Sequence, residues 1–348
     1  MAIVVKLGMP EVENMQGTVA FFKQMDEFFN DHISIKDAEV CHYFPCRVMD
    51  KIIKNKEVLF SDVEFLNDKE EEENIWNILL EILNNLDESQ YNTELIKSIK
   101  RLFETKEKMD NYIRYNYDGI YRTEEQIIED EKDDFIYNAR RFVFCTSMNF
   151  DCLPMWSYYS KDNKYEAYGI TFLADDVKRF IEKNVKDVLP KYNIKMGKVI
   201  YDDAEKSDLI LNLLSQTNKM YLKEINTHRK TERRKILTNY SSRFFYLIKS
   251  YAPFFKNQYY KHEEEYRFLI ELDNTMIRHK KLKHGFRQVG ALWVPYITIG
   301  FDPQDVRIFI LNPSDGSDLL VQKSIDAYLQ CYDYNTTSIG RSTIPLRY

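Results

Sequence analysis

Three short segments of the sequence combine polar and aromatic side chains that suit chemistry on a ligand. The first is Cys41-His42-Tyr43-Phe44, which has the character of a strand. A histidine there is able to donate a hydrogen bond to a sugar hydroxyl or a carbonyl group. A histidine flanked by apolar residues is more often a neutral member of the core. Both interpretations of His42 stay open at this point.

The second segment is Trp156-Ser157-Tyr158-Tyr159, a predicted short helix that follows Thr146-Ser147. Adjacent residues of a helix point about 100° apart, so one tyrosine is expected to pack inward while the other lines a cleft. An exposed tyrosine ring is a stacking surface for a flat ligand. The alternative is ordinary aromatic packing.

The third segment is His262-Glu263-Glu264-Glu265-Tyr266-Arg267, directly before an apolar run. Alternate side chains of an extended chain share a face, so Glu263 and Glu265 are predicted to lie with Arg267. Two like carboxylates repel, and one is expected to pair with a cation or to have a raised pKa, as catalytic carboxylates often do. The alternative is a solvated run of charge.

Two further groupings give weaker signals. Residues 228–235 (HRKTERRK) hold five Lys and Arg against one Glu. Such a run suits contact with nucleic-acid phosphates, although it is more often one exposed helix face. Cys41, His42 and Cys46 lack a fourth ligand at a recognised spacing, so the sequence assigns no metal.

The composition excludes several classes of protein. The chain has 348 residues, 10 of them Gly, and no glycine-rich phosphate-binding motif, so side chains must hold any nucleotide. A net charge of -6 argues against coating of nucleic acid by the whole surface. The five cysteines form no C-x-x-C pair, and no run resembles a signal peptide or a membrane span. These features predict a cytoplasmic protein without a membrane partner.

Helical and strand-like patterns alternate in blocks, which predicts a mixed sheet interrupted by helical insertions. Helices are expected at 16–31 and 153–160, at 46–54 behind Pro45, and at 324–329. Strands are expected at 38–44, 58–65, 141–145, 168–172, 198–201, 265–272, 291–299 and 306–310. The predicted layout is a helical lead over 1–37 and one α+β domain over 38–348, with helical insertions at about 69–140 and 176–255.

Taken in order, these segments resemble a bacterial family of unknown function. The family pattern runs hY, LND, LMWsHY, a Gly-containing strand and E-x-EyR. This chain has His42-Tyr43, FLND at 65–68, LPMWSYYS, YGITF and EEEYRFLI, and the tail segments VRIFILNP and STIPLRY resemble the family's ending. The resemblance covers about residues 38–348.

The arrangement is remotely similar to the ADP-ribosyltransferase superfamily with a His-Tyr-Glu signature. That similarity implies a mixed split β-sheet and NAD as the substrate. It implies contacts to the cofactor from His42, Tyr43, Arg47 and Ser157, and catalytic roles for Tyr158, Tyr159, Glu263 and Glu265. Two departures are visible. Tyr43 stands where the poly(ADP-ribose) polymerases of that superfamily have Gly, and three consecutive glutamates leave the catalytic one open.

The leading hypothesis is therefore an NAD-dependent ADP-ribosyltransferase-like enzyme. A carboxylate beside the ribose would stabilise the oxocarbenium-like transition state of nicotinamide release. The resemblance implies a bacterial toxin or phage-defence effector that modifies a protein or a nucleic acid. NAD hydrolysis without transfer is a variant of this hypothesis. The alternative is a non-catalytic module on the same fold that binds nucleic acid or protein.

Overall fold

The chain forms two compact units in the computed structural model, which describes residues 16–66, 71–87, 89–102, 139–160, 167–186, 192–273, 282–313 and 318–345. Unit 1 is drawn from Met1–His32, Asp68–Asn138 and Ile200–Gln258. Unit 2 is drawn from Ile33–Asn67, Ala139–Val199 and Tyr259–Tyr348. The chain therefore passes repeatedly between the two units.

Unit 1 is helical in its described part. Its helices are α1 (Gln16–Ile33), α2 (Glu71–Asn85), a helical stretch at 93–102, α8 (Asp203–Thr227) and α9 (Arg233–Tyr251), followed by the short 3-10 turn η4 (Ala252–Phe254). Aromatic rings join α1 to α9, since Phe22 lies 5.8 Å from Tyr240 and Phe29 lies 4.7 Å from Tyr251 between ring centroids. Burial of these rings supplies the driving force for packing the helices together.

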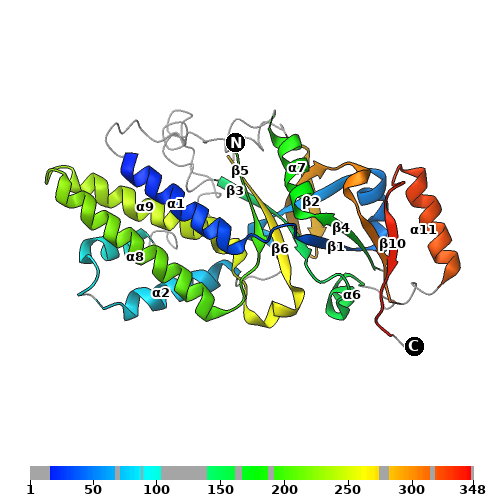
Figure 1. The fold of residues 1–348 in the computed structure, drawn as a ribbon, viewed down its shortest axis with the longest axis horizontal. Coiled ribbons are helices and arrows are strands. Elements are labelled where there is room, and N and C mark those ends of the chain that lie inside the picture. Colours follow the sequence, from blue (N-terminus) through cyan, green and yellow to red (C-terminus); the bar gives the residue numbers. More distant parts are fainter. Residues whose placement is uncertain are drawn as a thin grey trace. The chain divides into compact units, whose positions relative to one another are not determined.

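Unit 2 is built on a mixed sheet of ten described strands (Figure 1). The strands are β1 (Glu39–Pro45), β2 (Glu57–Asp62), β3 (Ala139–Ser147), β4 (Ala167–Leu173), β5 (Tyr192–Lys198), β6 (Glu265–Asp273), β7 (His284–Val289), β8 (Leu292–Gly300), β9 (Ile308–Leu311) and β10 (Ser338–Arg341). Their order is β10-β9-β4-β1-β3-β2-β8-β7, with β6 and β5 added beside β3. Neighbouring strands are antiparallel except β9 and β10.

The sheet splits along β3. One edge of β3 pairs with β6 over the full strand, from Ala139↔Asp273 to Ser147↔Glu265. The other edge is shared between two strands: Ser147 pairs with β1, while Phe142 and Val143 pair with β2. Residues 144–146 lie between these two pairings. The unit is thus an α+β fold in which three strands meet at β3.

The two faces of this sheet carry different side chains, because alternate residues point to opposite sides. The apolar face holds Phe44, Phe144 and Phe268. It is covered by α7 (Ala174–Val185) and α11 (Leu319–Cys331), which bury residues such as Phe180 and Leu329 in the same cluster. The opposite face, called the α6 face below, holds Cys41, Tyr43, Trp156 and their neighbours, and α6 (Leu153–Tyr159) packs there.

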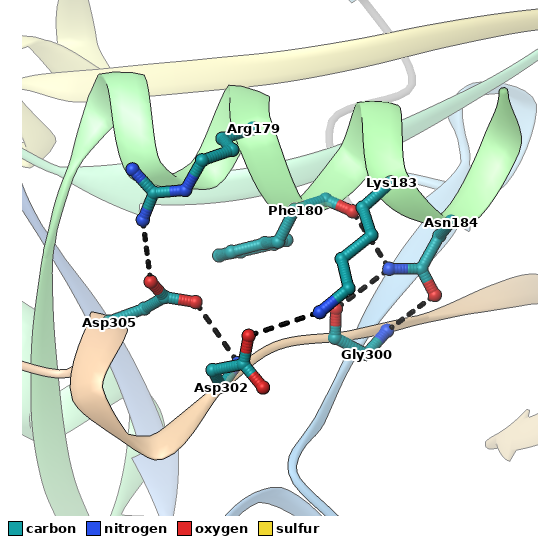
Figure 2. Close-up of polar contacts among 7 residues, drawn as sticks. All are labelled: Arg179, Phe180, Lys183, Asn184, Gly300, Asp302 and Asp305. Atoms are coloured by element: carbon teal, nitrogen blue, oxygen red, sulfur yellow. Dashed lines mark hydrogen bonds and ion pairs between the residues drawn. The ribbon is translucent and has the colours of Figure 1, made fainter.

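Helix α7 is pinned to the chain beside β8 by polar contacts (Figure 2). Asn184 donates from Nδ2 to the carbonyls of Phe180 at 2.7 Å and Gly300 at 2.8 Å, and its Oδ1 accepts from Gly300 N at 3.1 Å. Arg179 bonds Asp305 at 2.7 Å, and Lys183 bonds Asp302 at 3.2 Å. These contacts fix the helix that covers the apolar face.

Most predicted elements of unit 2 are present near their expected bounds. The strand predicted at 198–201 is wrong in position, since β5 runs from Tyr192 to Lys198. Its sequence, YNIKMGK, contains Lys195 between Ile194 and Met196 and Gly197 directly after them, and both residues weaken the strand signal. The predicted helix at 46–54 is a 3-10 turn, η1 (Cys46–Val48), followed by a π-helical turn, η2 (Asp50–Lys54). Strands β7 and β10 were not predicted.

The two-unit division differs from the predicted layout of a lead followed by one domain. Helix α1, expected in a lead over 1–37, contacts α9 in unit 1. The expected insertion at 176–255 also contains most of α7 and all of β5, which belong to unit 2. Of the expected insertion at 69–140, residues 103–138 lie outside the described residues.

Candidate functional site

The ends of three neighbouring strands bring the three sequence segments to one place. Ser147, the last residue of β3, pairs with Cys41 of β1 on one side and with Glu265, the first residue of β6, on the other. Helix α6 follows β3 after a short loop and packs on β1. The register thus juxtaposes residues more than 220 positions apart in the sequence, such as Cys41 and Glu265.

Tyr43 packs inside the meeting point of β1, β3, β6 and α6, which is called the corner below. Its ring is buried, lies edge-on to Trp156 at 4.7 Å and stacks on Tyr159 at 6.2 Å between centroids. Its hydroxyl donates to the carbonyl of Asn149 at 2.7 Å and accepts from the N–H of Cys152 at 3.3 Å. Burial raises the pKa of Tyr43, so the phenol stays protonated and keeps donating. Tyr43 is a positioning residue for the loop that leads into α6.

Close packing beside Tyr43 explains the glycine of the sequence segment YGITF. Gly169 of β4 pairs with Tyr43 of β1. A Cβ at position 169 would lie 2.9 Å from the sulfur of Cys41 and 3.7 Å from the Trp156 ring. A Cβ at 169 would therefore overlap the Cys41 sulfur, and a larger residue would force the packing between β4 and β1 to shift.

The two tyrosines of α6 separate as the helical spacing predicted. Tyr159 is half-buried against Tyr43, whereas Tyr158 keeps 51% of its surface exposed. The Tyr158 hydroxyl lies 2.9 Å from Nε2 of His262, so the exposed ring has a fixed polar anchor. His262 is the second-last residue of a 3-10 segment, η5 (Gln258–Glu263), and Glu264 alone separates this segment from the first residue of β6.

The three consecutive glutamates have three different environments. Glu263 lies in η5, so the prediction that Glu263 and Glu265 share a strand face is wrong. The cause is Glu264, whose φ of 42° turns the chain sharply into β6. Such a left-handed conformation is strained for a non-glycine residue. Ser147 Oγ donates to the Glu263 carbonyl at 2.6 Å and stabilises the turn.

Glu264 presents its carboxylate at the surface beside the β3 loop. Its side chain is exposed, and Oε1 accepts from Nδ2 of Asn149 at 3.2 Å. The backbone carbonyl of the same residue, Asn149, accepts a hydrogen bond from the Tyr43 hydroxyl. One loop residue thus links the buried tyrosine to the exposed carboxylate. Glu264 is therefore the most accessible carboxylate of the three.

Glu265 is buried and ion-paired. It is 5% exposed, and both of its oxygens accept from Arg267, at 2.9 Å from Nε and 2.8 Å from Nη2. Arg267 is 1% exposed and lies on the same strand face, as the sequence predicted. A bidentate pair of this kind fixes the side chain in one orientation. The buried ion pair thus holds the Glu265 side chain in place at the start of β6.

Electrostatics at this corner favour positive charge. Burial, together with the carboxylates of Glu264, Glu263 and Asp151, raises the pKa of the Cys152 thiol. Asp151 is itself held ionised: burial opposes this, but hydrogen bonds from Ser342, Trp156 and Thr343 lower its pKa below the ordinary value. The shortest of these, from Ser342 Oγ, is 2.6 Å. Three carboxylates therefore surround Cys152.

His42 points away from this corner, onto the apolar face. Its ring packs against Phe144 at 4.7 Å and Phe44 at 6.1 Å, and Nδ1 lies 3.3 Å from the Cys145 carbonyl within the split of the sheet. Burial lowers its pKa to about 4 against the effect of that hydrogen bond, and the charge of Arg287 adds to the lowering. His42 is a neutral histidine that occupies the split between β1 and β2.

The remaining predicted residues lie at separate places. Ser157 is exposed on α6 next to Tyr158. Arg47 is exposed in η1, beyond Pro45. Pro45 is four strand residues from Cys41, or about 13 Å along β1. The structure thus brings Tyr43, Ser157, Tyr158, Tyr159 and the three glutamates together, and separates His42 and Arg47 from them.

Sequence reasoning gave no role to Asn149 or Asp151, which organise the loop before α6. The only signal for either was its place after the strand that ends at Ser147. Trp156 Nε1 donates to Asp151 at 2.9 Å, and Thr343 N donates to it at 2.7 Å. In the described ranges, no group of three or more His, Cys, Asp or Glu side chains forms a metal site. Within the same ranges, no helix has the length and apolar character to cross a bilayer.

Comparison with known families gives one match. A family model described as a protein of unknown function (DUF2971) matches residues 155–268, about a third of the chain. The matched region begins in α6 and ends in β6, so it contains Tyr158 and Glu265 but neither His42 nor Asp151. This supports the predicted resemblance to an uncharacterised domain family over that region. Searches of curated proteins and of solved structures gave no significant match.

Proposed function

We propose that unit 2 cleaves the nicotinamide–ribose bond of NAD and transfers ADP-ribose to a macromolecule, at the corner built by Tyr43, α6 and Glu264. The observation that carries the proposal is that an exposed aromatic ring and an exposed carboxylate lie at the same corner. Tyr158, anchored by His262, supplies the stacking surface, and Glu264 supplies the carboxylate, where β1, β3 and β6 meet. In the reaction, the C1′–N bond breaks, nicotinamide leaves, and a nucleophile of the acceptor bonds to C1′.

Tyr158 is assigned to the nicotinamide ring. Half of its surface is open, and the hydrogen bond to His262 limits its rotation. The ring of nicotinamide carries positive charge in NAD, and a cationic ring is attracted to an aromatic face. The neighbouring Tyr159 is assigned to support, because its contact with Tyr43 holds α6 in place.

Glu264 is assigned to the developing positive charge at the ribose. An oxocarbenium-like centre is stabilised by a nearby carboxylate that costs no reorganisation during the reaction. Glu264 is exposed, while Glu265 has both oxygens engaged by Arg267. Glu265 is accordingly assigned to positioning, through β6, and Glu263 adds negative potential at the same corner.

The test is an assay of nicotinamide release and of label transfer from NAD labelled in the adenylate half. Glu264→Gln is expected to lower turnover by about 10² to 10³ without changing the urea midpoint. The matched control is Glu182→Gln, an exposed carboxylate on α7. Wild-type protein that releases no nicotinamide, or Glu264→Gln with wild-type turnover, overturns the proposal. Release without transfer assigns the chain to NAD hydrolysis instead.

A second candidate function is nucleic-acid binding by unit 1. The sequence run 228–235 comprises the turn after α8 and the first residues of α9, and its five Lys and Arg residues are exposed. Neutralising Arg233, Arg234 and Lys235 is expected to weaken binding of a duplex oligonucleotide and to reduce the salt slope by up to three units. Salt-independent binding, or binding equal to that of wild type, excludes this candidate.

A further inference from the structure

The hairpin of β7 and β8 exposes an unusual amount of apolar surface in unit 2. Phe286 of β7 is 59% exposed and Trp293 of β8 is 62% exposed, and Val289 and Leu292 are exposed beside the turn. The turn is formed by Gly290, whose φ is 60°, and Ala291, which fits a type II′ hairpin with Gly in its first central position. Isolated exposed apolar residues are common, but a cluster of four on one hairpin indicates an interaction surface.

The hairpin also ends the sheet. In the strand order of the described residues, β7 is the terminal strand and pairs with β8 alone. Natural sheets blunt such an edge with charges, Pro or a bulge. Here the edge strand reads HGFRQV and is exposed over its last four residues. An exposed edge of this kind is a template for one more strand.

The backbone parity of the hairpin identifies the groups that would bind this strand. Residues that flank a two-residue turn form a hydrogen-bonded pair, so Val289 and alternate residues before it point their backbone groups at β8. The bond from Thr298 N to Lys283 O at 2.8 Å agrees with that parity. The backbone N–H and C=O of Phe286 and Gln288 therefore point outward, away from β8.

Charge decides the nature of the added strand. Between Asp273 and Asp302 the sequence contains no Asp or Glu, but holds Arg278, Lys280, Lys281, Lys283 and Arg287. Lys283 forms an ion pair with Glu57 of β2 at 2.6 Å, so Arg287 is the cation of β7 that the added strand would meet. This stretch is basic in a chain whose net charge is -6. Two copies of the same basic edge would repel each other, which disfavours a second copy as the occupant. An acidic strand is complementary.

We propose that β7 binds an extended acidic peptide of a partner protein, which adds to the sheet as an antiparallel or parallel strand. Its main chain bonds the outward groups of Phe286 and Gln288, its apolar side chains cover Phe286, and its carboxylates lie near Arg287. Phe286 and Gln288 share one face with Trp293, which is opposite Gln288 in the register, so the indole extends the apolar cover over that face. The proposal is independent of NAD cleavage, because it uses none of the residues assigned to that reaction.

The test is fluorescence anisotropy with a labelled decapeptide of alternating Glu and Val. The key variant is Gln288→Pro, which removes an outward N–H while leaving the bonds to β8 in place. Gln288→Ala is the matched control, because it removes the same side-chain bond to Gly290 but keeps the N–H. We expect Gln288→Pro to weaken binding at least tenfold and Gln288→Ala to bind as wild type does. Circular dichroism and urea unfolding confirm that the proline variant is folded.

Three outcomes would overturn the proposal. The first is equal binding by the proline and alanine variants, which excludes strand addition. The second is equal affinity for a decapeptide of alternating Lys and Val, which excludes charge complementarity. The third is tighter binding of a single-stranded oligonucleotide that Gln288→Pro does not affect, which assigns the hairpin to nucleic acid. Phe286→Ser provides an independent check, since it is expected to weaken peptide binding while the edge backbone is intact.

Discussion

The two faces of the unit 2 sheet give their histidine and carboxyl groups different surroundings. On the apolar face, His42 and Asp62 are both driven toward their neutral forms, with the pKa lowered to about 4 for His42 and raised to about 6 for Asp62. On the α6 face, Glu265 is ion-paired with Arg267, and hydrogen bonds lower the pKa of Asp151. The difference teaches that one sheet serves two purposes. Its apolar face forms the hydrophobic core, and its α6 face holds charged groups in fixed positions that suit a ligand.

The physical origin of this contrast is the number of polar partners. Asp62 lies on β2 with Phe60 and is 2% exposed; burial and the nearby Glu64 raise its pKa, and Arg140 only partly offsets them. Its Oδ2 has no hydrogen-bond partner. Asp151, in contrast, accepts four hydrogen bonds from Trp156, Ser342 and Thr343. Burial with few hydrogen bonds favours the neutral form of a carboxyl group, and several donors restore its charge.

The largest effect is expected from separating Glu265 and Arg267. Arg267→Met leaves a carboxylate buried without its bidentate partner and is expected to destabilise the protein by about 3–5 kcal/mol. The double variant Glu265→Leu/Arg267→Met is expected to lose less than the sum of the single variants, because no unpaired charge remains. Urea unfolding of both single variants and the double variant measures this coupling.

The control for that cycle lies on the other face of the same strand. Ile270→Val removes one methylene group from the apolar cluster and is expected to cost about 0.5–1.5 kcal/mol. A cost for Arg267→Met no larger than this would mean that the buried pair contributes little, and the distinction between the faces would fail.

The next effect concerns pH, and it has opposite signs for the two groups of the apolar face. His42 has a folded pKa of about 4 against an ordinary value of 6.5, so its protonation destabilises the fold as pH falls through this window. Asp62 has a folded pKa of about 6 against 3.8, so its ionisation destabilises the fold as pH rises through that window. Each shift corresponds to roughly 3 kcal/mol.

Two variants separate these contributions. The unfolding free energy of His42→Gln, relative to wild type, is expected to fall between pH 4 and 6.5, because the variant lacks the penalty that wild type has at low pH. The relative value for Asp62→Asn is expected to rise between about pH 4 and 6. Urea titrations at intervals of half a pH unit measure both curves. Curves with the same slope would show that the apolar face does not favour neutral forms.

A smaller effect is expected at Tyr43. Tyr43→Phe keeps the ring contacts but leaves the Asn149 carbonyl and the Cys152 N–H without the hydroxyl, at an expected cost of about 1–3 kcal/mol. Tyr158→Phe is the matched control, since that hydroxyl is at the surface, and its stability is expected to stay within about 0.5 kcal/mol of wild type. Equal unfolding curves for the two variants would contradict the positioning role of Tyr43.

The sequence predicted the strands that alternate clearly and the short α6 helix, but not how their faces combine. Residues 265–272 were recognisable because EYRFLIEL is a short run rich in aromatic and aliphatic residues. Strand β7 was not predicted, because apolar and polar residues scarcely alternate in its sequence, HGFRQV. The turn at Glu264 was unpredictable in principle, because glutamate gives no signal for a positive φ. A local pattern also carries no information about the contacts of Asp151 with Ser342 and Thr343, which lie about 190 residues away.

The smallest effects are expected where α7 covers the apolar face (Figure 2). Asn184→Ala removes three hydrogen bonds to Phe180 and Gly300 and leaves backbone groups unpaired, at an expected cost of about 1–2 kcal/mol. Lys183→Ala removes an ion pair between two exposed side chains and is expected to change stability by less than about 0.5 kcal/mol.

The comparison between these neighbouring residues separates burial from charge as the source of stability on this face. If α7 is held by satisfied backbone groups, Asn184→Ala lowers the urea midpoint and Lys183→Ala does not, in low and in moderate salt alike. If the surface charges hold it, Lys183→Ala has the larger effect at low ionic strength, and salt removes the difference. The second result would place stabilising charge on the face that otherwise favours neutral groups, and would remove the contrast with the α6 face.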